Sequence, residues 1–208
     1  MNAVYPTNGI KEYWNQRYKE KSFVYGEDPN LFFAEQVKKL KPGKIILPCE
    51  GEGRNAVFAA NLNWEVQAFD LCAAAKMKSL ELATKKDAQF EYIIGDAFEI
   101  EFEKEAADAI AFIYAHFPAE IRKAIHRKSI NWLKPGGKII IEAFNTTQIN
   151  NNSGGPKEPS MLYSKESILS DFEDLQTELI ESMQIELNEG QSHKGLADVI
   201  RYIGIKVS

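Results

Sequence analysis

Short apolar runs alternate with longer amphipathic stretches along most of the chain. The short runs, rich in Ile, Val, Phe and Ala, predict buried strands. These strands are expected at 44–48, 65–69, 90–94, 107–113 and 138–144. The stretches between them predict helices that begin near Arg54, Ala73 and Ala119. Strands that alternate with helices are typical of an α/β fold, in which helices cover both faces of a mostly parallel sheet.

The pattern changes in the last third of the chain. The helix that begins near Ala119 is expected to end at 132–133, because Pro135 cannot continue a helix and the glycines after it accept a left-handed turn. Residues 145–159 are rich in Asn, Thr, Ser, Gly and Pro, which predicts a long loop. After it we expect a short helix at 165–172 and two strands at 175–188 and 199–207, joined by 189–195. The two strands are expected to form an antiparallel hairpin at the sheet edge.

Residues 1–40 precede the alternating region and are rich in aromatic side chains. They include Tyr13, Trp14, Tyr18, Phe23, Tyr25, Phe32 and Phe33. One interpretation is an N-terminal helix whose rings pack on the sheet. The other is a lid, because residues 25–29 place turn formers beside an aromatic ring, as expected of a flap over a small molecule. We treat 1–40 as an aromatic-rich helical lid segment and 41–208 as the body of a single domain.

Composition narrows the functional classes. The chain has 208 residues, of which 44% are hydrophobic and 26% charged, so it can bury one sizeable core. A formal net charge of -5 disfavours a nucleic-acid partner. Cys49 and Cys72 lack the spacing of a zinc site, so we expect no metal and a reducing compartment. No apolar run predicts a signal peptide or a membrane span, so we expect a cytoplasmic protein with no membrane partner.

The clearest chemical signal follows the first expected strand, where Gly51-x-Gly53-x-x-Ala56 opens a helix. Asp70 comes about 20 residues later, where dinucleotide-binding proteins hold ribose hydroxyls with a carboxylate. Glu50 and Glu52 stand on both sides of Gly51, however, and carboxylates there disfavour a pyrophosphate. S-adenosylmethionine suits such a loop better, since it is a nucleoside without phosphate that carries a sulfonium and an ammonium. The alternative is that both glutamates face water and favour the helix dipole.

Further motifs lie at the ends of the other expected strands. Together with the glycine loop they are Glu50-Gly51-Glu52-Gly53-Arg54-Asn55-Ala56, Asp70, Gly95-Asp96-Ala97 and Leu133-Lys134-Pro135-Gly136-Gly137. With these motifs the chain resembles the class I S-adenosylmethionine-dependent methyltransferases from about residue 13 to the C-terminus. The resemblance implies a Rossmann-like, doubly wound sheet of seven strands, with S-adenosylmethionine as cofactor and S-adenosylhomocysteine as product. Within that superfamily, Trp14-x-x-Arg17-Tyr18, Tyr25-Gly26 and His193-x-Gly195 are similar to the tellurite-resistance and thiopurine-type small-molecule methyltransferases.

The resemblance also implies roles for single residues. The positions expected to bind the cofactor are Trp14, Tyr25, Glu50, Gly51, Gly53, Asp70, Leu71, Asp96, Ala97 and Ile113. Gly51 and Gly53 would line the methionine part and Asp70 would hold the ribose. Leu71 would pack on the adenine, while Asp96 and the backbone N–H of Ala97 would bind its polar edge.

One position departs from the family pattern. The acidic residue that the family usually has near the end of the first strand is replaced here by Leu47, followed by Pro48 and Cys49. Glu50 is our candidate for the lost contact to the methionine ammonium.

Methyl transfer needs positioning and a dry site more than covalent chemistry. A general base is needed only if the attacking atom must lose a proton. His116 lies after the fourth strand, where it would bind the substrate, accept its proton, or instead cap the next helix. We expect His126 to be a solvated helix residue and His193 to be a turn residue with a less favoured role in substrate contact.

These observations favour a methyltransferase that acts on a small molecule, with a thiol, selenol or reduced metalloid as the acceptor that fits the resemblance. Two alternatives stay open. One is an NAD(P)-dependent reductase, which the glycine motif permits. The other is a non-catalytic S-adenosylmethionine-binding module, which the altered end of the first strand permits. We expect a monomer or a homodimer.

Overall fold

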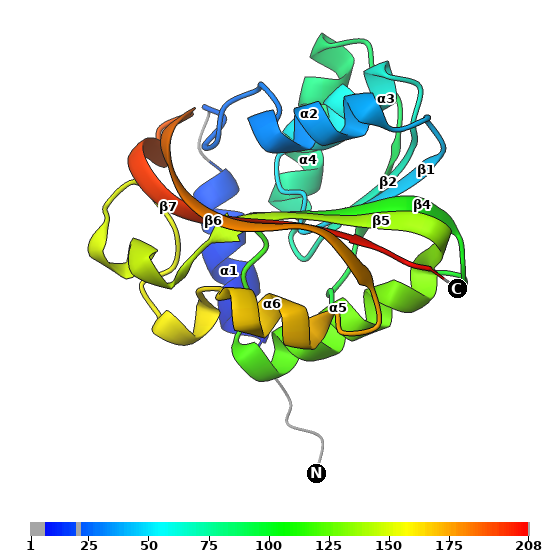
Figure 1. The fold of residues 1–208 in the computed structure, drawn as a ribbon. Coiled ribbons are helices and arrows are strands. Elements are labelled where there is room, and N and C mark those ends of the chain that lie inside the picture. The colour runs from blue at the N-terminus through cyan, green and yellow to red at the C-terminus, as the bar shows by residue number, and fades with distance from the viewer. Residues whose placement is uncertain (1–6, 20–21, 208) are drawn as a thin grey trace.

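A computed structural model describes residues 7–19 and 22–207 (Figure 1). The strands are β1 Lys44–Pro48, β2 Glu65–Asp70, β3 Glu91–Ile94, β4 Ala107–Ile113, β5 Leu133–Phe144, β6 Gln176–Glu189 and β7 His193–Ile205. They form one sheet of seven strands in the order β3-β2-β1-β4-β5-β7-β6. β1 to β5 pair in parallel, whereas β7 pairs antiparallel with both β5 and β6. The expected Rossmann-like α/β sheet with a C-terminal antiparallel hairpin is therefore confirmed.

Helices cover both faces of this sheet. They are α1 Thr7–Tyr18, α2 Leu31–Lys39, α3 Arg54–Asn61, α4 Ala73–Lys85, α5 Ala119–Trp132 and α6 Lys165–Asp171. Figure 1 shows α2, α3 and α4 on one face and α5 and α6 on the other. Successive strand residues supply the two cores: Ile45 and Leu47 belong to one buried cluster and Ile46 to the other. This alternation is why the central strands read as continuous apolar runs.

The order of the strands places the site. The chain moves outward from β1 to β3 and then crosses back to β4 on the other side of β1. In such sheets the loops at the carboxyl ends of the two central strands diverge and leave a crevice between them. The glycine loop after β1 and the segment after β4 therefore meet at this edge.

The N-terminal helices pack at the same edge. α1 contacts α4, and Asn15 Oδ1 accepts a hydrogen bond from the backbone N of Ala74 in the first turn of α4 (3.2 Å). Asn30 caps α2 by accepting the Phe33 amide (2.9 Å), and Phe33 itself is fully buried. This part of the segment is thus core, as the packing interpretation expects.

Two predicted boundaries are wrong. α5 ends at Trp132 as expected, but β5 begins at once with Leu133, because Leu133 pairs with Ala107 ahead of an irregularity in the β4 register. β7 begins at His193 instead of near 199, because the hairpin pairs continuously up to Glu189 and His193 and leaves only a tight turn. Backbone pairing extends these strands past their apolar residues.

The segment 145–159 is more ordered than a long loop. It contains a 3-10 helix, η1 Thr146–Asn150, and the buried side chain of Gln148 bonds Ser153 Oγ and the backbone N of Asp198. A second 3-10 turn, η2 Pro159–Met161, leads toward α6.

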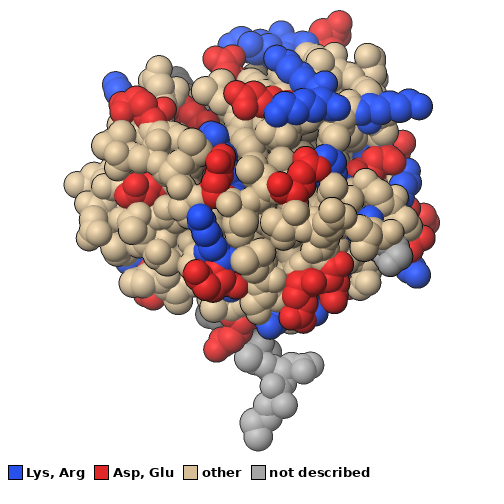
Figure 2. All heavy atoms as spheres, viewed as in Figure 1, with Lys and Arg blue, Asp and Glu red and all other residues tan. Residues whose placement is uncertain are grey.

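Two features are absent from residues 7–19 and 22–207, a membrane-spanning helix and a metal-binding cluster. None of the helices there is both long and apolar enough to cross a bilayer. Within the same residues, no group of three or more His, Cys, Asp or Glu side chains is arranged to hold a metal ion. Figure 2 shows acidic and basic side chains interspersed over the face that it presents.

Candidate active site

Three residues of the glycine loop after β1 adopt the left-handed backbone conformation. Cys49, Gly51 and Gly53 have φ values of 54°, 61° and 87°. A Cβ on Gly51 would lie 2.7 Å from the Tyr18 hydroxyl, and one on Gly53 would lie 2.1 Å from Ser79 Oγ. We expected these glycines to make room for a ligand. The structure shows that they also make room for α1 and α4, which pack directly on the loop.

Asp70 ends β2 beside this loop. Its Oδ2 accepts the Gly51 amide (3.1 Å) and its Oδ1 accepts the Cys72 amide (3.2 Å). Burial raises the pKa of Asp70 against the effect of these hydrogen bonds. The carboxylate is therefore fixed between the two loops where a ribose is expected.

Asp96 lies in the next turn along the same edge. The Gly95 amide bonds the Asp70 carbonyl (2.9 Å), which places the two acidic turns side by side. Asp96 Oδ1 accepts the Phe98 amide (2.8 Å), and Ala97 is buried behind it. Leu71 is partly exposed between the two turns. The residues expected to hold an adenosine are thus brought together.

Glu50 faces the start of α3. Its Oε1 accepts the amides of Asn55 and Ala56, both at 2.8 Å. Burial raises the pKa of Glu50 to about 7 against these hydrogen bonds. This geometry matches the helix-dipole alternative in part, although the side chain is partly buried rather than fully solvated. Its contact with a methionine ammonium stays a prediction.

Glu52 turns the other way, toward the N-terminal segment. Its Oε2 accepts the Val24 amide (2.7 Å) and the Tyr25 amide (3.4 Å), and its Oε1 lies 3.6 Å from Lys78 Nζ. The side chain is only 2% exposed, so it does not face water. It bonds the segment that carries Tyr25.

The cations near the loop are paired with carboxylates. Arg54 Nη2 lies 2.9 Å from Glu189 Oε2, and Lys78 pairs with Glu52. A pyrophosphate needs donors that are free to face it. The edge therefore offers two ordered acceptors, the carboxylates of Asp70 and Asp96, and two cations that are already paired, which fits a phosphate-free nucleoside better than a dinucleotide.

Four aromatic rings pack together next to the glycine loop. We call this cluster the acceptor box, and it consists of Tyr25, Tyr114, Phe144 and His193. The His193 ring lies 4.5 Å from Tyr25, 4.5 Å from Tyr114 and 5.2 Å from Phe144, measured between ring centroids. Tyr114 follows β4 with a left-handed φ of 51°, a conformation that costs energy in a bulky residue. Its hydroxyl donates to the buried Glu142 (2.9 Å), which fixes the ring.

His193 begins β7 and is not the turn residue that the sequence analysis favoured. Its Nδ1 lies 3.2 Å from Glu189 Oε2, and the ring is buried rather than placed in a free turn. Burial lowers the pKa of His193 despite Glu189, so the ring is neutral at pH 7. Burial alone would raise the pKa of Glu189, but the hydrogen bond from His193 and the charge of Arg54 bring it to about 2. A carboxylate that orients a neutral imidazole is an arrangement suited to accepting a proton.

His116 has a different environment. Its Nδ1 lies 2.8 Å from the Met161 carbonyl, and its Nε2 accepts the Phe144 amide (3.2 Å). Burial lowers its pKa to about 4. Both ring nitrogens are thus held by backbone groups, and neither caps α5. In this conformation His116 connects β5 to the segment before α6 and has no nitrogen left for a substrate.

The remaining predicted positions divide between the N-terminal segment and the sheet. Trp14 stacks on Tyr18 at 5.5 Å, and Tyr18 covers Gly51. Ile113 is 9% exposed at the end of β4. The prediction of a solvated His126 is wrong, because its ring is fully buried and its Nδ1 lies 2.9 Å from Asp171 of α6.

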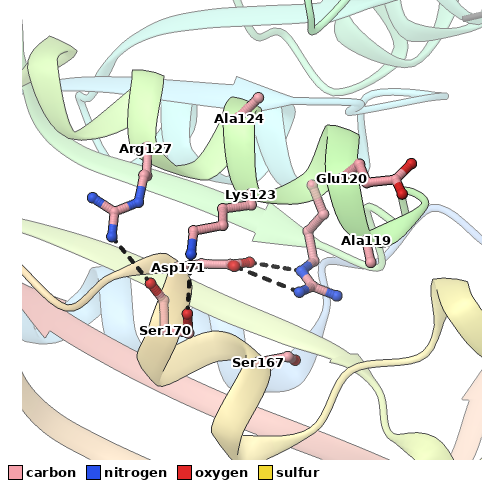
Figure 3. Close-up of a pocket in the computed structure, with 9 residues that line it drawn as sticks. Ala119, Glu120, Lys123, Ala124, Arg127, Ser167, Ser170 and Asp171 are labelled. Carbon is pink, nitrogen blue, oxygen red and sulfur yellow. Dashed lines mark hydrogen bonds and ion pairs between the residues drawn. The ribbon is translucent and has the colours of Figure 1, made fainter. Parts of the chain in front are cut away.

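A groove between α5 and α6 lies away from these residues (Figure 3). Its basic side chains reach across to α6: Arg122 Nε bonds Asp171 (2.6 Å) and Lys123 Nζ bonds Ser170 Oγ (3.2 Å). These contacts join the two helices, and none of the lining residues belongs to the glycine loop or the acceptor box.

Comparisons with known proteins show what the chain is similar to. Residues 48–137, which are less than half of the chain, match a family model described as a methyltransferase domain. The chain is 28% identical over 147 residues to phosphoethanolamine N-methyltransferase 3 of Arabidopsis thaliana, an alignment that covers 69% of this chain and 29% of the relative. The chain thus spans less than a third of the length of the curated relatives it matches.

Solved structures share the fold. TehB from Haemophilus influenzae superposes with a TM-score of 0.68 at 16% identity, over 94% of this chain and 66% of TehB. Geranyl diphosphate C-methyltransferase from Streptomyces coelicolor, solved with Mg²⁺, geranyl diphosphate and S-adenosyl-L-homocysteine, gives 0.69 at 13% identity, over 98% and 99% of the two chains.

Proposed function

We propose that the methyltransferase domain of this chain transfers the methyl group of S-adenosylmethionine to a small-molecule acceptor with a soft attacking atom, such as a thiol, a selenol or a reduced metalloid. The observation that carries the proposal is the charge arrangement at the glycine loop. Asp70 and Asp96 are ordered side by side, while Arg54 is neutralised by Glu189. That arrangement favours adenosine and a cationic sulfur over the diphosphate of a nicotinamide cofactor.

The acceptor box supports a small acceptor. Phe144 and His193 are at most 5% exposed, and the rings of Tyr25 and Tyr114 pack against His193. A macromolecular substrate needs an open approach, whereas a buried aromatic box excludes water around a small one. The relatives do not decide the acceptor, since one is named for phosphoethanolamine and another for geranyl diphosphate.

Different residues would bind the cofactor, position the acceptor and accept its proton. When bound, S-adenosylmethionine supplies an electrophilic methyl group. Asp70 and Asp96 would hold the nucleoside, and the rings of the acceptor box would exclude water and position the attacking atom. His193, oriented by Glu189, accepts a proton if the attacking atom carries one.

Calorimetric titration with S-adenosylhomocysteine and with NADH tests the cofactor. We expect S-adenosylhomocysteine to bind and NADH not to bind. Asp70→Ala and Asp96→Ala should each weaken S-adenosylhomocysteine by about 1–3 kcal/mol, the cost of a lost buried polar partner. Binding of NADH alone, or unchanged affinity in both variants, would overturn the assignment.

Turnover identifies the acceptor. Formation of S-adenosylhomocysteine from S-adenosylmethionine is measured with benzenethiol, selenite, tellurite under reducing conditions, and phosphoethanolamine. Turnover with the sulfur, selenium or tellurium compounds supports the proposal. Turnover with phosphoethanolamine alone would instead make this chain an amine methyltransferase, and cofactor binding without any turnover would favour a binding module.

A further inference from the structure

Glu52 stands in the middle of the glycine loop, yet its carboxylate bonds the N-terminal segment and not the loop itself. Its Oε2 accepts the Val24 amide at 2.7 Å, and the side chain is almost completely buried. Lys78 of α4 bonds the same segment, with Nζ 2.9 Å from the Ser22 carbonyl and 4.4 Å from the centre of the Phe23 ring. The backbone of Ser22–Tyr25 is therefore fixed by charged side chains of the cofactor half of the molecule.

Arg54, two residues after Glu52, bonds the other end of this segment. Its Nη1 donates to the carbonyls of Tyr25 (3.2 Å) and Asp28 (3.5 Å), while its Nη2 pairs with Glu189. Glu189 in turn orients His193 in the acceptor box. One short stretch of the glycine loop thus connects to Tyr25 and His193 at the same time.

The tip of the β6–β7 hairpin contacts the segment from the opposite side. The amides of Gln191 and Ser192 both donate to the Val24 carbonyl, at 3.1 Å and 3.3 Å. Gly190 has a φ of 65°, and a Cβ there would lie 2.4 Å from the backbone N of Gly26. The segment is clamped between the glycine loop and the hairpin, and the Tyr25 ring is placed by this clamp.

We propose that Glu52 is a positioning residue that couples cofactor binding at the glycine loop to closure of the Ser22–Asp28 segment, with Tyr25, over the acceptor box. The inference rests on the proposed function. A cofactor that orders the loop also orders Glu52, and Glu52 holds the amides of Val24 and Tyr25. Because coupling between two sites is reciprocal, the factor by which the cofactor favours the closed segment equals the factor by which the closed segment binds the cofactor more tightly than the open one.

Hydrogen–deuterium exchange of the Val24 and Tyr25 amides tests this coupling, with S-adenosylhomocysteine as the probe. In the unaltered protein the probe should slow exchange of both amides, by a factor within the range of about 5 to 150 that is typical of coupled sites. Glu52→Gln keeps the volume but loses the charge that faces Lys78 and the charged acceptor for the two amides. It should lose most of that slowing, and its affinity for the probe should fall by the same factor.

Glu27→Gln is the matched control, because it removes a carboxylate from the same segment whose partner, Lys85, lies on the exposed surface. It should leave both measurements unchanged. Gly190→Ala disturbs the clamp from the hairpin side and should reproduce the loss seen in Glu52→Gln. Thermal unfolding and the exchange of β4 amides report whether each variant is folded, and Gly190→Ala carries the test if Glu52→Gln is not.

The outcomes separate the inference from the function on which it rests. If the probe binds the unaltered protein and Glu52→Gln retains the full slowing, the coupling is refuted while the cofactor assignment stands. If Glu52→Gln loses the slowing of amide exchange but keeps its affinity for S-adenosylhomocysteine, the coupling is also refuted, because the two effects must change together. If the probe does not bind the unaltered protein at all, the proposed function itself is wrong.

Discussion

Glu50 Oε1 lies 2.8 Å from the backbone nitrogen of Ala56, in the first turn of α3. The pKa of this carboxyl is raised to about 7 by burial, above its ordinary value of 4.5. Between these two values the folded protein binds a proton at Glu50 that the unfolded chain has lost. Stability from this group is therefore present below pH 4.5 and is lost as the pH rises through about 7. A cation placed against Glu50 would lower that pKa and expel the proton.

The first prediction follows from this proton. If Glu50 replaces the carboxylate missing at Leu47, S-adenosylhomocysteine binding at pH 6.5 should release a proton, because the ligand ammonium favours the charged carboxylate. Titration calorimetry in two buffers of different ionisation enthalpy measures the release as a difference in apparent binding enthalpy. Glu50→Gln should abolish the difference. If the apparent binding enthalpy of the unaltered protein is the same in both buffers, Glu50 does not bind the ammonium and its only role is to cap α3.

The second prediction concerns His116. Its pKa of about 4 lies below the ordinary 6.5, so the unfolded chain takes up a proton first as the pH falls. Stability from the neutral ring is complete above pH 6.5 and is lost between there and about 4. The loss is at most about 3 kcal/mol, at 1.36 kcal/mol for each pKa unit.

Urea unfolding at several pH values checks this loss, with His116→Gln as the reference for all carboxyl groups that titrate in the same range. The free-energy difference between the unaltered protein and the variant should shrink as the pH falls from 6.5 to 4. A difference that does not vary with pH would mean that the backbone contacts of His116 do not select its neutral form.

The sequence located the central strands because they are buried on both faces. β1 and β4 have the predicted bounds, since each is almost entirely apolar apart from one charged residue near its start, Lys44 in β1 and Asp108 in β4. The start of β7 was missed because His193 and Lys194 owe their strand conformation to pairing with β6 and not to hydrophobic spacing. Pairing between segments is not visible in a local pattern.

The same limit applies to the site. Asp70 and Asp96 could be assigned to one edge because Asp70 ends β2 and Asp96 follows the last residue of β3 by two positions, and the topology brings those strand ends together. The acceptor box combines Tyr25, Phe144 and His193, which only the folded chain brings together. His126 shows the reverse error: its partner Asp171 lies 45 positions away in the chain, so nothing near it indicated burial.

The third prediction concerns the packing of the glycine loop on α4. Gly53 has a φ of 87°, and an added Cβ would lie 2.1 Å from Ser79 Oγ and 2.9 Å from the Ser79 backbone. Gly53→Ala should therefore lower the free energy of unfolding by about 1–3 kcal/mol, through the strained conformation and the overpacked contact.

Gly9→Ala is the matched control for this substitution. Gly9 lies within α1 and an added Cβ there would meet nothing within 4 Å. Alanine should stabilise the helix by roughly 0.5–1 kcal/mol. Thermal or urea unfolding compares the two variants. Equal stabilities would contradict the close approach of α4 to the loop.

The last prediction concerns proton transfer at His193. The neutral ring is oriented by Glu189, whose pKa of about 2 keeps it ionised throughout the working range. With an acceptor that carries a proton, such as a thiol, His193→Gln should slow methyl transfer by about 10²–10⁴-fold, the usual contribution of a positioned base. Its affinity for S-adenosylhomocysteine should stay close to that of the unaltered protein, since His193 lies in the acceptor box and not at the nucleoside edge.

The pH dependence of the rate distinguishes a base from a structural ring. Because the pKa of His193 is lowered by burial, activity should persist below pH 6.5. Glu189→Gln removes the charge that favours the protonated ring, so the acid limb of the profile should move to still lower pH. If Glu189→Gln moves that limb upward, or if His193→Gln turns over thiols at the unaltered rate, another group accepts the proton.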